Sequence, residues 1–335
     1  MVKLDTMENP HRLPLPLQRL MGERLAAVAI NRYPAERTDD LRLALARHAG
    51  LPEGCALTLG NGSDELISML SMACDVPGAV FMAPVPSFVM YAMSAQLQGI
   101  RFVGVPLTAE LELDEPAMLA AIAEHQPTLL YLAYPNNPTA NLWDEAVVER
   151  LAQAMAVHRG LLVMDEAYQP FAARDSMGLL RRHPHVLVMR TMSKLGLAGV
   201  RIGYLMARSA LIAEVDKLRP PFNISVLNAE AALFALEHAE VYAEQARLIV
   251  QERQRLFEAL QQLPGARPFR SDANMVLVRL PGAAQVFAEL KARRILVKHV
   301  AGLHPLLADC LRLTVGTAEE NAQLIDALRD ITRSA

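Results

Sequence analysis

One stretch decides how this chain is interpreted: Thr191-Met192-Ser193-Lys194-Leu195-Gly196-Leu197-Ala198-Gly199-Val200-Arg201-Ile202-Gly203. It places Lys194 in an apolar, glycine-rich loop, directly after the hydroxyl of Ser193 and seven residues before Arg201. Burial beside apolar groups or another cation lowers the pKa of a lysine amine, and the neutral amine can form a Schiff base. Lysine is scarce elsewhere in the chain, where it occurs only as Lys3, Lys217, Lys291 and Lys298. The alternative is a solvated loop lysine, and the rest of the sequence decides between the two.

Short apolar runs alternate with helical patterns around this loop. We expect strands at 56–59, 79–83, 101–105, 128–133, 161–164 and 186–189. Helical patterns separate them at 66–72, 88–98, 115–124 and 144–157, after an earlier helix at 39–48. Strands that are apolar throughout and alternate with helices are typical of a parallel sheet covered on both faces. The sequence therefore predicts an α/β fold with a mainly parallel central sheet.

The two ends of the chain differ from this pattern. A long helical region at 227–263 ends at Pro264-Gly265, and a second αβ pattern follows it. Residues 1–30 begin as an arm whose prolines, Pro10, Pro14 and Pro16, argue against a helix. We expect three parts: an arm at 1–30 that packs with the small domain, a large domain at 31–263, and a small C-terminal α/β domain at 264–335.

Polar residues follow several of the expected strands. Asn137, Asp165 and Lys194 each come just after a strand. Parallel α/β sheets bind ligands beyond the carboxyl ends of their strands. These three side chains are therefore expected at one edge of the sheet.

A glycine-rich turn, Gly60-Asn61-Gly62-Ser63-Asp64-Glu65, precedes the helix at 66–72. Ser63 is a good N-cap, and acidic residues in a first turn suit the helix dipole. The turn is therefore compatible with a helix start that has no ligand. The same free N–H groups could also bind a phosphate.

Composition excludes several classes of function. The chain has 335 residues, 52% of them hydrophobic, and a net charge of −3. Neither a nucleic-acid groove nor a membrane surface is indicated. The cysteines Cys55, Cys74 and Cys310 are far apart and form no CxxC pair, so we expect no metal site and no disulfide framework. The N-terminus lacks an apolar signal core, and we expect a cytoplasmic protein.

Together, the motifs of this chain resemble those of the fold-type I pyridoxal-phosphate aminotransferases, and among them the histidinol-phosphate aminotransferase family. The resemblance runs from Asn9 to Gly316. It is carried by Glu8-Asn9-Pro10, Tyr33-Pro34, the glycine-rich turn, Pro86-Ser87-Phe88-Val89-Met90-Tyr91, Asn136-Asn137-Pro138-Thr139, Asp165-Glu166-Ala167-Tyr168, the lysine loop, Ser271-Asp272-Ala273-Asn274 and Leu311-Arg312-Leu313-Thr314-Val315-Gly316.

The resemblance implies pyridoxal 5′-phosphate as cofactor. It implies that Asp165 keeps the pyridine nitrogen protonated, that Asn137 and Tyr168 donate to the phenolic oxygen, and that Phe88 stacks on the ring. The cofactor phosphate would be bound by Gly62, Ser63, Asp64, Thr191, Ser193 and Arg201. Tyr33 would reach this phosphate from the other subunit, which implies a homodimer with shared active sites.

The resemblance also implies the reaction. Lys194 would hold the cofactor as a Schiff base and later move the proton from the substrate α-carbon to the cofactor. L-Histidinol phosphate and 2-oxoglutarate would give imidazole acetol phosphate and L-glutamate, as in histidine biosynthesis. Arg312, Lys298 and Asn9 would bind the substrate. Lys298 stands where the family often has arginine, and Asn9 where some members have tyrosine.

Three alternatives share most of these motifs. A threonine-phosphate decarboxylase also needs a cation for a phosphate. An aromatic or broad-range aminotransferase differs mainly around Asn9 and Lys298. A cofactor-binding effector domain of a transcription regulator would need a basic DNA-binding module, for which this sequence has no spare segment.

Overall fold

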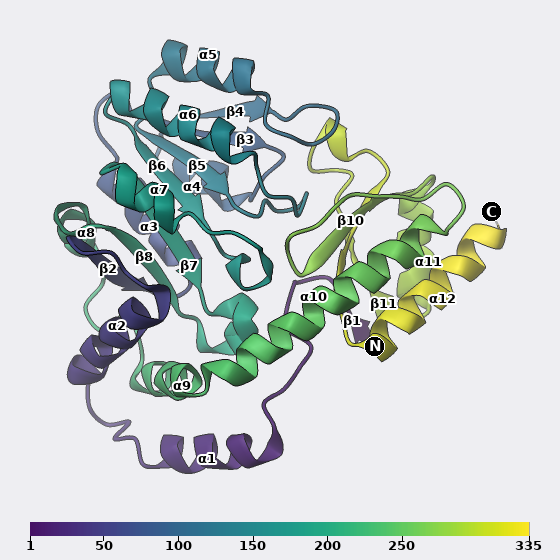
Figure 1. Ribbon diagram of the computed structural model, residues 1–335, viewed down its shortest axis with the longest axis horizontal. Coiled ribbons are helices and arrows are strands. Elements are labelled where there is room, and N and C mark those ends of the chain that lie inside the picture. The colour runs from purple at the N-terminus through teal and green to yellow at the C-terminus, as the bar shows by residue number, and fades with distance from the viewer. Residues whose placement is uncertain (335) are drawn as a thin grey trace.

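A central seven-stranded sheet organises the computed structural model, which describes residues 1–334 (Figure 1). Its strand order is β2 (Cys55–Gly60), β8 (Gly203–Arg208), β7 (Val186–Thr191), β6 (Leu161–Asp165), β5 (Leu129–Ala133), β3 (Val80–Val85) and β4 (Arg101–Pro106). Within it β8 runs antiparallel to both of its neighbours, and the pairs from β7 to β4 are parallel. The predicted α/β fold with a mainly parallel sheet is confirmed.

Helices cover both faces of this sheet, because apolar side chains leave each strand on both sides. Along β5, Leu130 and Leu132 enter one core, whereas Leu129 and Tyr131 enter the other. The first core is covered by α2 (Ala35–Ala49), α5 (Glu115–His125), α6 (Glu145–Val157), α7 (Met177–Arg182) and α9 (Val226–Glu237). The second is covered by α3 (Ser63–Ala73), α4 (Met90–Leu97) and α8 (Ser209–Asp216).

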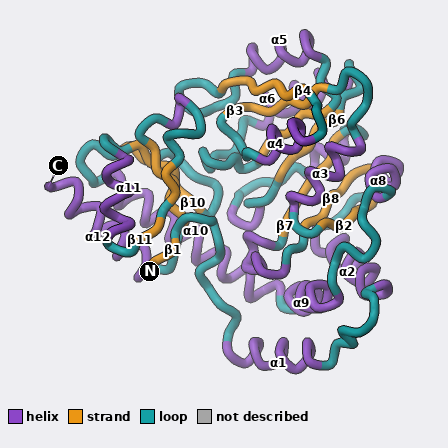
Figure 2. The backbone as a smooth tube through the Cα atoms, turned by 180° about the vertical axis from the view of Figure 1, so that it is seen from behind, coloured by secondary structure: helices purple, strands orange, loops and turns teal. Residues whose placement is uncertain are grey.

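A smaller antiparallel sheet lies beside the first (Figure 2). Its order is β12 (Lys298–His299), β13 (Cys310–Thr314), β10 (Met275–Arg279) and β9 (Arg267–Pro268). The helices α10 (Ala239–Gln261), α11 (Ala283–Ala292) and α12 (Ala318–Ser334) pack on its side of the molecule. The N-terminal β1 (Val2–Lys3) pairs with β11 (Ile295–Leu296), so both ends of the described chain lie near this sheet.

The long helix α10 links the two parts (Figure 1). Near its start, Tyr242 belongs to the core of the large sheet. Farther along, Ile249, Leu256 and Leu260 belong to the core of the small sheet. Their helical spacing gives α10 a buried stripe that passes from one core to the other. The predicted boundary between the large and the small domain at residue 263 remains a prediction. It assigns the whole of α10 to the large domain, although part of this helix belongs to the core of the small sheet.

One expectation about helices is wrong. The arm contains a helix, α1 (Leu15–Ala26), with Pro14 at its N-cap and Pro16 in its first turn. Proline is tolerated there because the first N–H groups of a helix have no partner within it. The predicted helical region at 227–263 is confirmed, and it consists of two helices: His238, with φ of −117° and ψ of 35°, lies between the end of α9 and the start of α10. The sequence patterns also did not indicate β8, whose pairing places Gly203 opposite Thr191.

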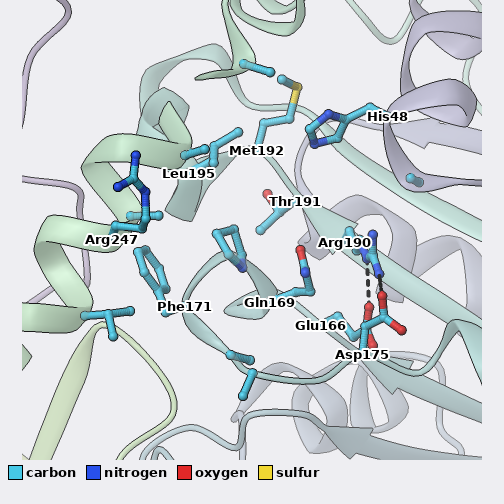
Figure 3. A pocket seen from close by; sticks show the side chains of 18 of the residues that line it. His48, Glu166, Gln169, Phe171, Asp175, Arg190, Thr191, Met192, Leu195 and Arg247 are labelled. Carbon is cyan, nitrogen blue, oxygen red and sulfur yellow. Dashed lines mark hydrogen bonds and ion pairs between the residues drawn. The ribbon is translucent and has the colours of Figure 1, made fainter. Parts of the chain in front are cut away.

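A buried ion pair joins two neighbouring strands of the large sheet (Figure 3). Glu166, directly after β6, accepts a hydrogen bond from Arg190 of β7, with 2.7 Å between Nε and Oε2. It also accepts one from the Ser176 N–H, and Arg190 reaches Asp175 at 3.3 Å. Glu166, Asp175 and Arg190 line a cavity of about 720 Å³ between the large sheet and α10. Its buried charges therefore bind one another.

We expect Arg190→Met to lower the free energy of unfolding by about 3–5 kcal/mol, because Glu166 would keep a buried charge without its partner. Urea unfolding of the apoprotein measures this loss. The double variant Arg190→Met/Glu166→Gln is the control. It also removes the unpaired charge of Glu166 and should therefore recover most of the stability. A single variant as stable as the unchanged protein would contradict the role of the ion pair.

Candidate active site

A cavity of about 120 Å³ opens beyond the carboxyl ends of β5, β6 and β7. Most residues predicted for cofactor binding line it: Ser63, Asp64, Phe88, Asn137, Asp165, Tyr168, Thr191, Ser193, Lys194 and Arg201. Met7 of the N-terminal arm and Tyr91 of α4 line it as well. The structure therefore brings together residues that are far apart in the sequence, at the sheet edge where strand order predicts a ligand.

At one end of the cavity the backbone comes very close to α3. A Cβ atom on Gly203 would lie 2.7 Å from the Ser63 nitrogen, and one on Gly62 would lie 2.4 Å from Nη2 of Arg201. Gly62 also has a φ of +80°, which favours glycine. The start of β8 therefore packs directly on the first turn of α3. The free N–H groups of that turn can bind an anion.

Hydroxyl and guanidinium groups surround this helix start. Ser193 Oγ lies 3.0 Å from Thr191 Oγ1 and accepts a hydrogen bond from Arg201 Nη1 at 3.3 Å. The other terminal nitrogen, Nη2, lies 3.5 Å from a carboxylate oxygen of Asp64. Hydroxyls, a forked cation and a helix N-terminus together are a set of donors that suits a phosphate.

Lys194 projects between this anion-binding end and the arm. Its Nζ donates to the carbonyl oxygen of Thr6 at 3.1 Å and lies 5.8 Å from the ring centre of Tyr168. The pKa of Lys194 is lowered to about 8, first by burial and then by the guanidinium groups of Arg312 and Arg201. A neutral amine is thus accessible near neutral pH, as a nucleophile or proton acceptor requires.

The buried carboxyl of Asp165 also lines this cavity. It accepts hydrogen bonds from the Tyr91 hydroxyl at 2.6 Å and from the Ala167 N–H at 3.1 Å. Burial raises the pKa of Asp165 to about 6, although the Tyr91 hydrogen bond opposes this shift. A carboxylate has lone pairs beyond these two bonds, so it can still accept from a protonated ring nitrogen.

Sequence reasoning missed Tyr91 as part of the site. Tyr91 belongs to the motif Pro86-Ser87-Phe88-Val89-Met90-Tyr91, but the family resemblance implies a role only for Phe88 of that motif. Its available signal was the spacing to Phe88, because residues three apart near the start of a helix lie on the same side. Only the packing of α4 on the sheet shows that its hydroxyl reaches Asp165.

Arg312 reaches the site from the small sheet. Its Nη1 donates to Asn137 Oδ1 at 2.7 Å, and its Nη2 donates to the carbonyl oxygen of Asp5 at 2.8 Å. The side chain is buried, and its Nε has no hydrogen-bond partner among residues 1–334. Burial also raises the pKa of Tyr168, which keeps this phenol protonated as a possible donor.

Five predicted residues do not line the cavity: Gly62 and Arg312, described above, and Lys298, Asn9 and Tyr33. Lys298 is exposed on β12, directly opposite Arg312 of β13. Asn9 donates to the Leu195 carbonyl at 2.9 Å and to Gln245 at 3.0 Å, so its amide holds the arm against the lysine loop. Tyr33 is 77% exposed and stacks on Phe222 with 4.3 Å between ring centres.

This arrangement suits pyridoxal 5′-phosphate. An anion site, a lysine of lowered pKa and a buried carboxylate occur in one cavity and match the cofactor's phosphate, aldehyde and ring nitrogen. Phe88 lines the same cavity with an aromatic ring. In the part of the chain that the structure describes, no helix is long and apolar enough to cross a membrane.

Comparison with known proteins agrees with this geometry. The family model described as aminotransferase class I and II matches residues 2–328. A histidinol-phosphate aminotransferase of Methylibium petroleiphilum is 68% identical over 98% of this chain and 89% of the relative. That of Polaromonas naphthalenivorans is 64% identical over 98% of this chain and 90% of the relative.

A solved structure shows the same fold with the cofactor. It is a histidinol-phosphate aminotransferase of Sinorhizobium meliloti in complex with pyridoxal 5′-phosphate, with a TM-score of 0.88 and 28% identity. The match covers 99% of this chain and 91% of that one. The chain therefore belongs to the class I and II aminotransferases, in the histidinol-phosphate aminotransferase family, and its cofactor is pyridoxal 5′-phosphate.

Proposed function

We propose that this protein transfers the amino group of L-histidinol phosphate to 2-oxoglutarate, giving imidazole acetol phosphate and L-glutamate. The observation that carries the substrate assignment is a pair of cations on the small sheet, one of which, Arg312, contacts Asn137 of the cofactor cavity. Lys298 and Arg312 occupy directly opposite positions on neighbouring antiparallel strands, so their side chains leave the same face of the small sheet. The names of the relatives support the same substrate.

This cation pair lacks a compensating carboxylate. The partners of Arg312 are an amide oxygen and a backbone carbonyl, both uncharged. The side chain of Lys298 forms no hydrogen bond or ion pair with another described residue. Like charges directly opposite on two strands repel. A dianionic phosphate bound between them would remove this repulsion, and in the second half-reaction a carboxylate of 2-oxoglutarate would take its place at Arg312.

The cavity residues support the transamination chemistry. When bound, pyridoxal 5′-phosphate withdraws electrons from the carbon that loses a proton. We assign to Lys194 the attachment of the cofactor and, once released, the transfer of that proton. Asp165 would hold a proton on the ring nitrogen, and Asn137 with Tyr168 would donate to the phenolic oxygen. The donors around α3 would bind the phosphate.

A homodimer is the second part of the proposal. The aromatic pair of Tyr33 and Phe222 lies largely exposed, and no residue of α1 is buried. Three further large apolar side chains, Leu15 and Leu20 of α1 and Ile30 after it, are each at least half exposed. Large exposed apolar patches mark interfaces. We infer that a second subunit covers them, and that Tyr33 contacts the cofactor phosphate of that subunit.

The alternatives differ in what they do with an amino donor. An aminotransferase passes to the amino form of its cofactor with glutamate and returns with 2-oxoglutarate. A threonine-phosphate decarboxylase and a regulator domain would not complete this cycle. An aromatic aminotransferase would complete it without needing the phosphate-binding cations.

Lys194→Ala is expected to fold, to bind the cofactor reversibly and to lose nearly all turnover, because the covalent attachment and the proton carrier are both removed. Absorbance of the lysine-bound cofactor, recorded after desalting, measures the attachment. Lys291→Ala, which changes a lysine of α11, is the matched control and should behave like the unchanged protein. Retention of the lysine-bound absorbance in Lys194→Ala would rule out the assignment.

Lys298→Ala is expected to reduce kcat/KM for histidinol phosphate roughly 10- to 150-fold. A hydrogen bond to a charged group contributes about 1.5–3 kcal/mol, and the exposure of Lys298 favours the lower end. An unphosphorylated aromatic donor should be affected much less. Lys298→Arg should retain most of the activity. Equal losses for both donors, or no loss, would support a broad-range aminotransferase instead.

Tyr33→Phe is expected to weaken cofactor binding roughly 10-fold or more without dissociating the dimer, because one hydrogen bond to a charged phosphate is removed while the ring remains. Cofactor titration of the apoprotein and analytical ultracentrifugation measure the two properties separately. A fully active monomer would refute the shared site.

A further inference from the structure

Tyr91 is a buried residue of the site whose role is not part of the proposed function. It lies in the first turn of α4, and its hydroxyl donates to Oδ2 of Asp165 at 2.6 Å. The inference that follows rests on the proposed role of Asp165 toward the cofactor ring nitrogen.

Packing fixes the position of this hydroxyl. The Tyr91 ring stacks on Tyr131 of β5, with ring centres 4.4 Å apart and planes 4° apart. Phe88 meets the same ring edge-on at 5.6 Å. The tyrosine is thus held between a strand and the side chain that faces the cofactor cavity. This packing directs the hydroxyl of Tyr91 toward Asp165, the last residue of the neighbouring strand β6.

The two adjacent acids of this strand end have contrasting partners. Glu166 is bound by the cation Arg190, which neutralises it. Asp165 is bound by a neutral hydroxyl and by a backbone N–H, with no ion pair to any described residue. A cation at Asp165 would compete with the protonated ring nitrogen for the carboxylate. A neutral donor stabilises the ionised form and leaves its charge available.

We infer that Tyr91 is a positioning residue, which holds Asp165 ionised and oriented toward the cofactor ring nitrogen. The hydroxyl itself transfers no proton, because both burial and the nearby carboxylate raise its pKa well above the usual value. It acts only through Asp165. Its loss should therefore affect interactions with the ring nitrogen and spare those with the phosphate.

The chain offers a matched pair of variants for the test. Tyr91→Phe removes the hydroxyl that reaches Asp165 and keeps the ring. Tyr131→Phe removes a hydroxyl from the same aromatic stack, and that hydroxyl is buried without a hydrogen-bond partner among residues 1–334. Thermal unfolding of both apoproteins checks that the stack remains folded.

The main measurement is the affinity of the apoproteins for two probes. One is pyridoxal 5′-phosphate, and the other is its 1-deaza analogue, in which carbon replaces the ring nitrogen. Tyr91→Phe is expected to weaken binding of the first roughly 10-fold or more, since a hydrogen bond to a charged group is lost. It should change binding of the analogue much less. Tyr131→Phe should change neither.

The pH dependence of binding gives an independent readout. Asp64, Glu166, Tyr168, Tyr91 and Tyr131 are the titratable groups that interact with Asp165 from the surrounding elements. The pKa of Asp165, about 6, already includes the lowering caused by the Tyr91 hydrogen bond. Loss of this bond therefore raises the pKa of Asp165. The neutral carboxyl therefore persists to higher pH. When the pH is lowered, the affinity for pyridoxal 5′-phosphate should begin to fall at a higher pH in Tyr91→Phe than in the unchanged protein.

Several outcomes would overturn the inference. Equal weakening by Tyr91→Phe and Tyr131→Phe would show a packing effect. Equal weakening of both probes by Tyr91→Phe would show that the hydroxyl does not act through the ring nitrogen. If the unchanged protein binds both probes with equal affinity and unchanged pH dependence, the role proposed for Asp165 itself fails, and the inference fails with it.

Discussion

Burial of ionisable groups at one edge of the sheet is the constraint on which this site depends. Removing a charged group from water disfavours its charged form. The pKa of Lys194 is accordingly lowered to about 8, and that of Asp165 is raised to about 6. Both groups can therefore change protonation near neutral pH. The helices on both faces of the sheet provide the apolar surroundings, so the general architecture and the chemistry of the site have the same physical origin.

The alternation of side chains along a strand directs Asp165 and Glu166 to opposite faces of the sheet. Asp165 leaves β6 on the side of the core that contains Tyr91, and Glu166 leaves on the side of α2 and α9. One acid therefore meets a neutral phenol and stays available to the cofactor cavity. Its neighbour Glu166 is paired with Arg190 of the adjacent strand β7. Two adjacent residues of one motif thus have different tasks because the pleat directs them to opposite faces.

Segments from outside the large sheet complete the site. The arm supplies the Thr6 carbonyl to Lys194 and the Asp5 carbonyl to Arg312, and Asn9 holds the same arm against the lysine loop. The small sheet supplies Arg312, which contacts Asn137. Movement of the arm or of the small sheet would therefore change the contacts of Lys194 and Asn137, which line the cavity.

The sequence by itself determined the α/β class, most of the strands and the residues that gather at the strand ends. Apolar strands and polar strand ends are local patterns, so Asn137, Asp165 and Lys194 could be predicted as neighbours before any contact was known. The motifs of the family added Arg201, the glycine-rich turn and Phe88. Only the tertiary structure decided the antiparallel insertion of β8 and the contact between Tyr91 and Asp165. These features depend on packing between segments that are distant in the chain. The pattern of residues within one segment does not determine which distant side chain that segment will contact.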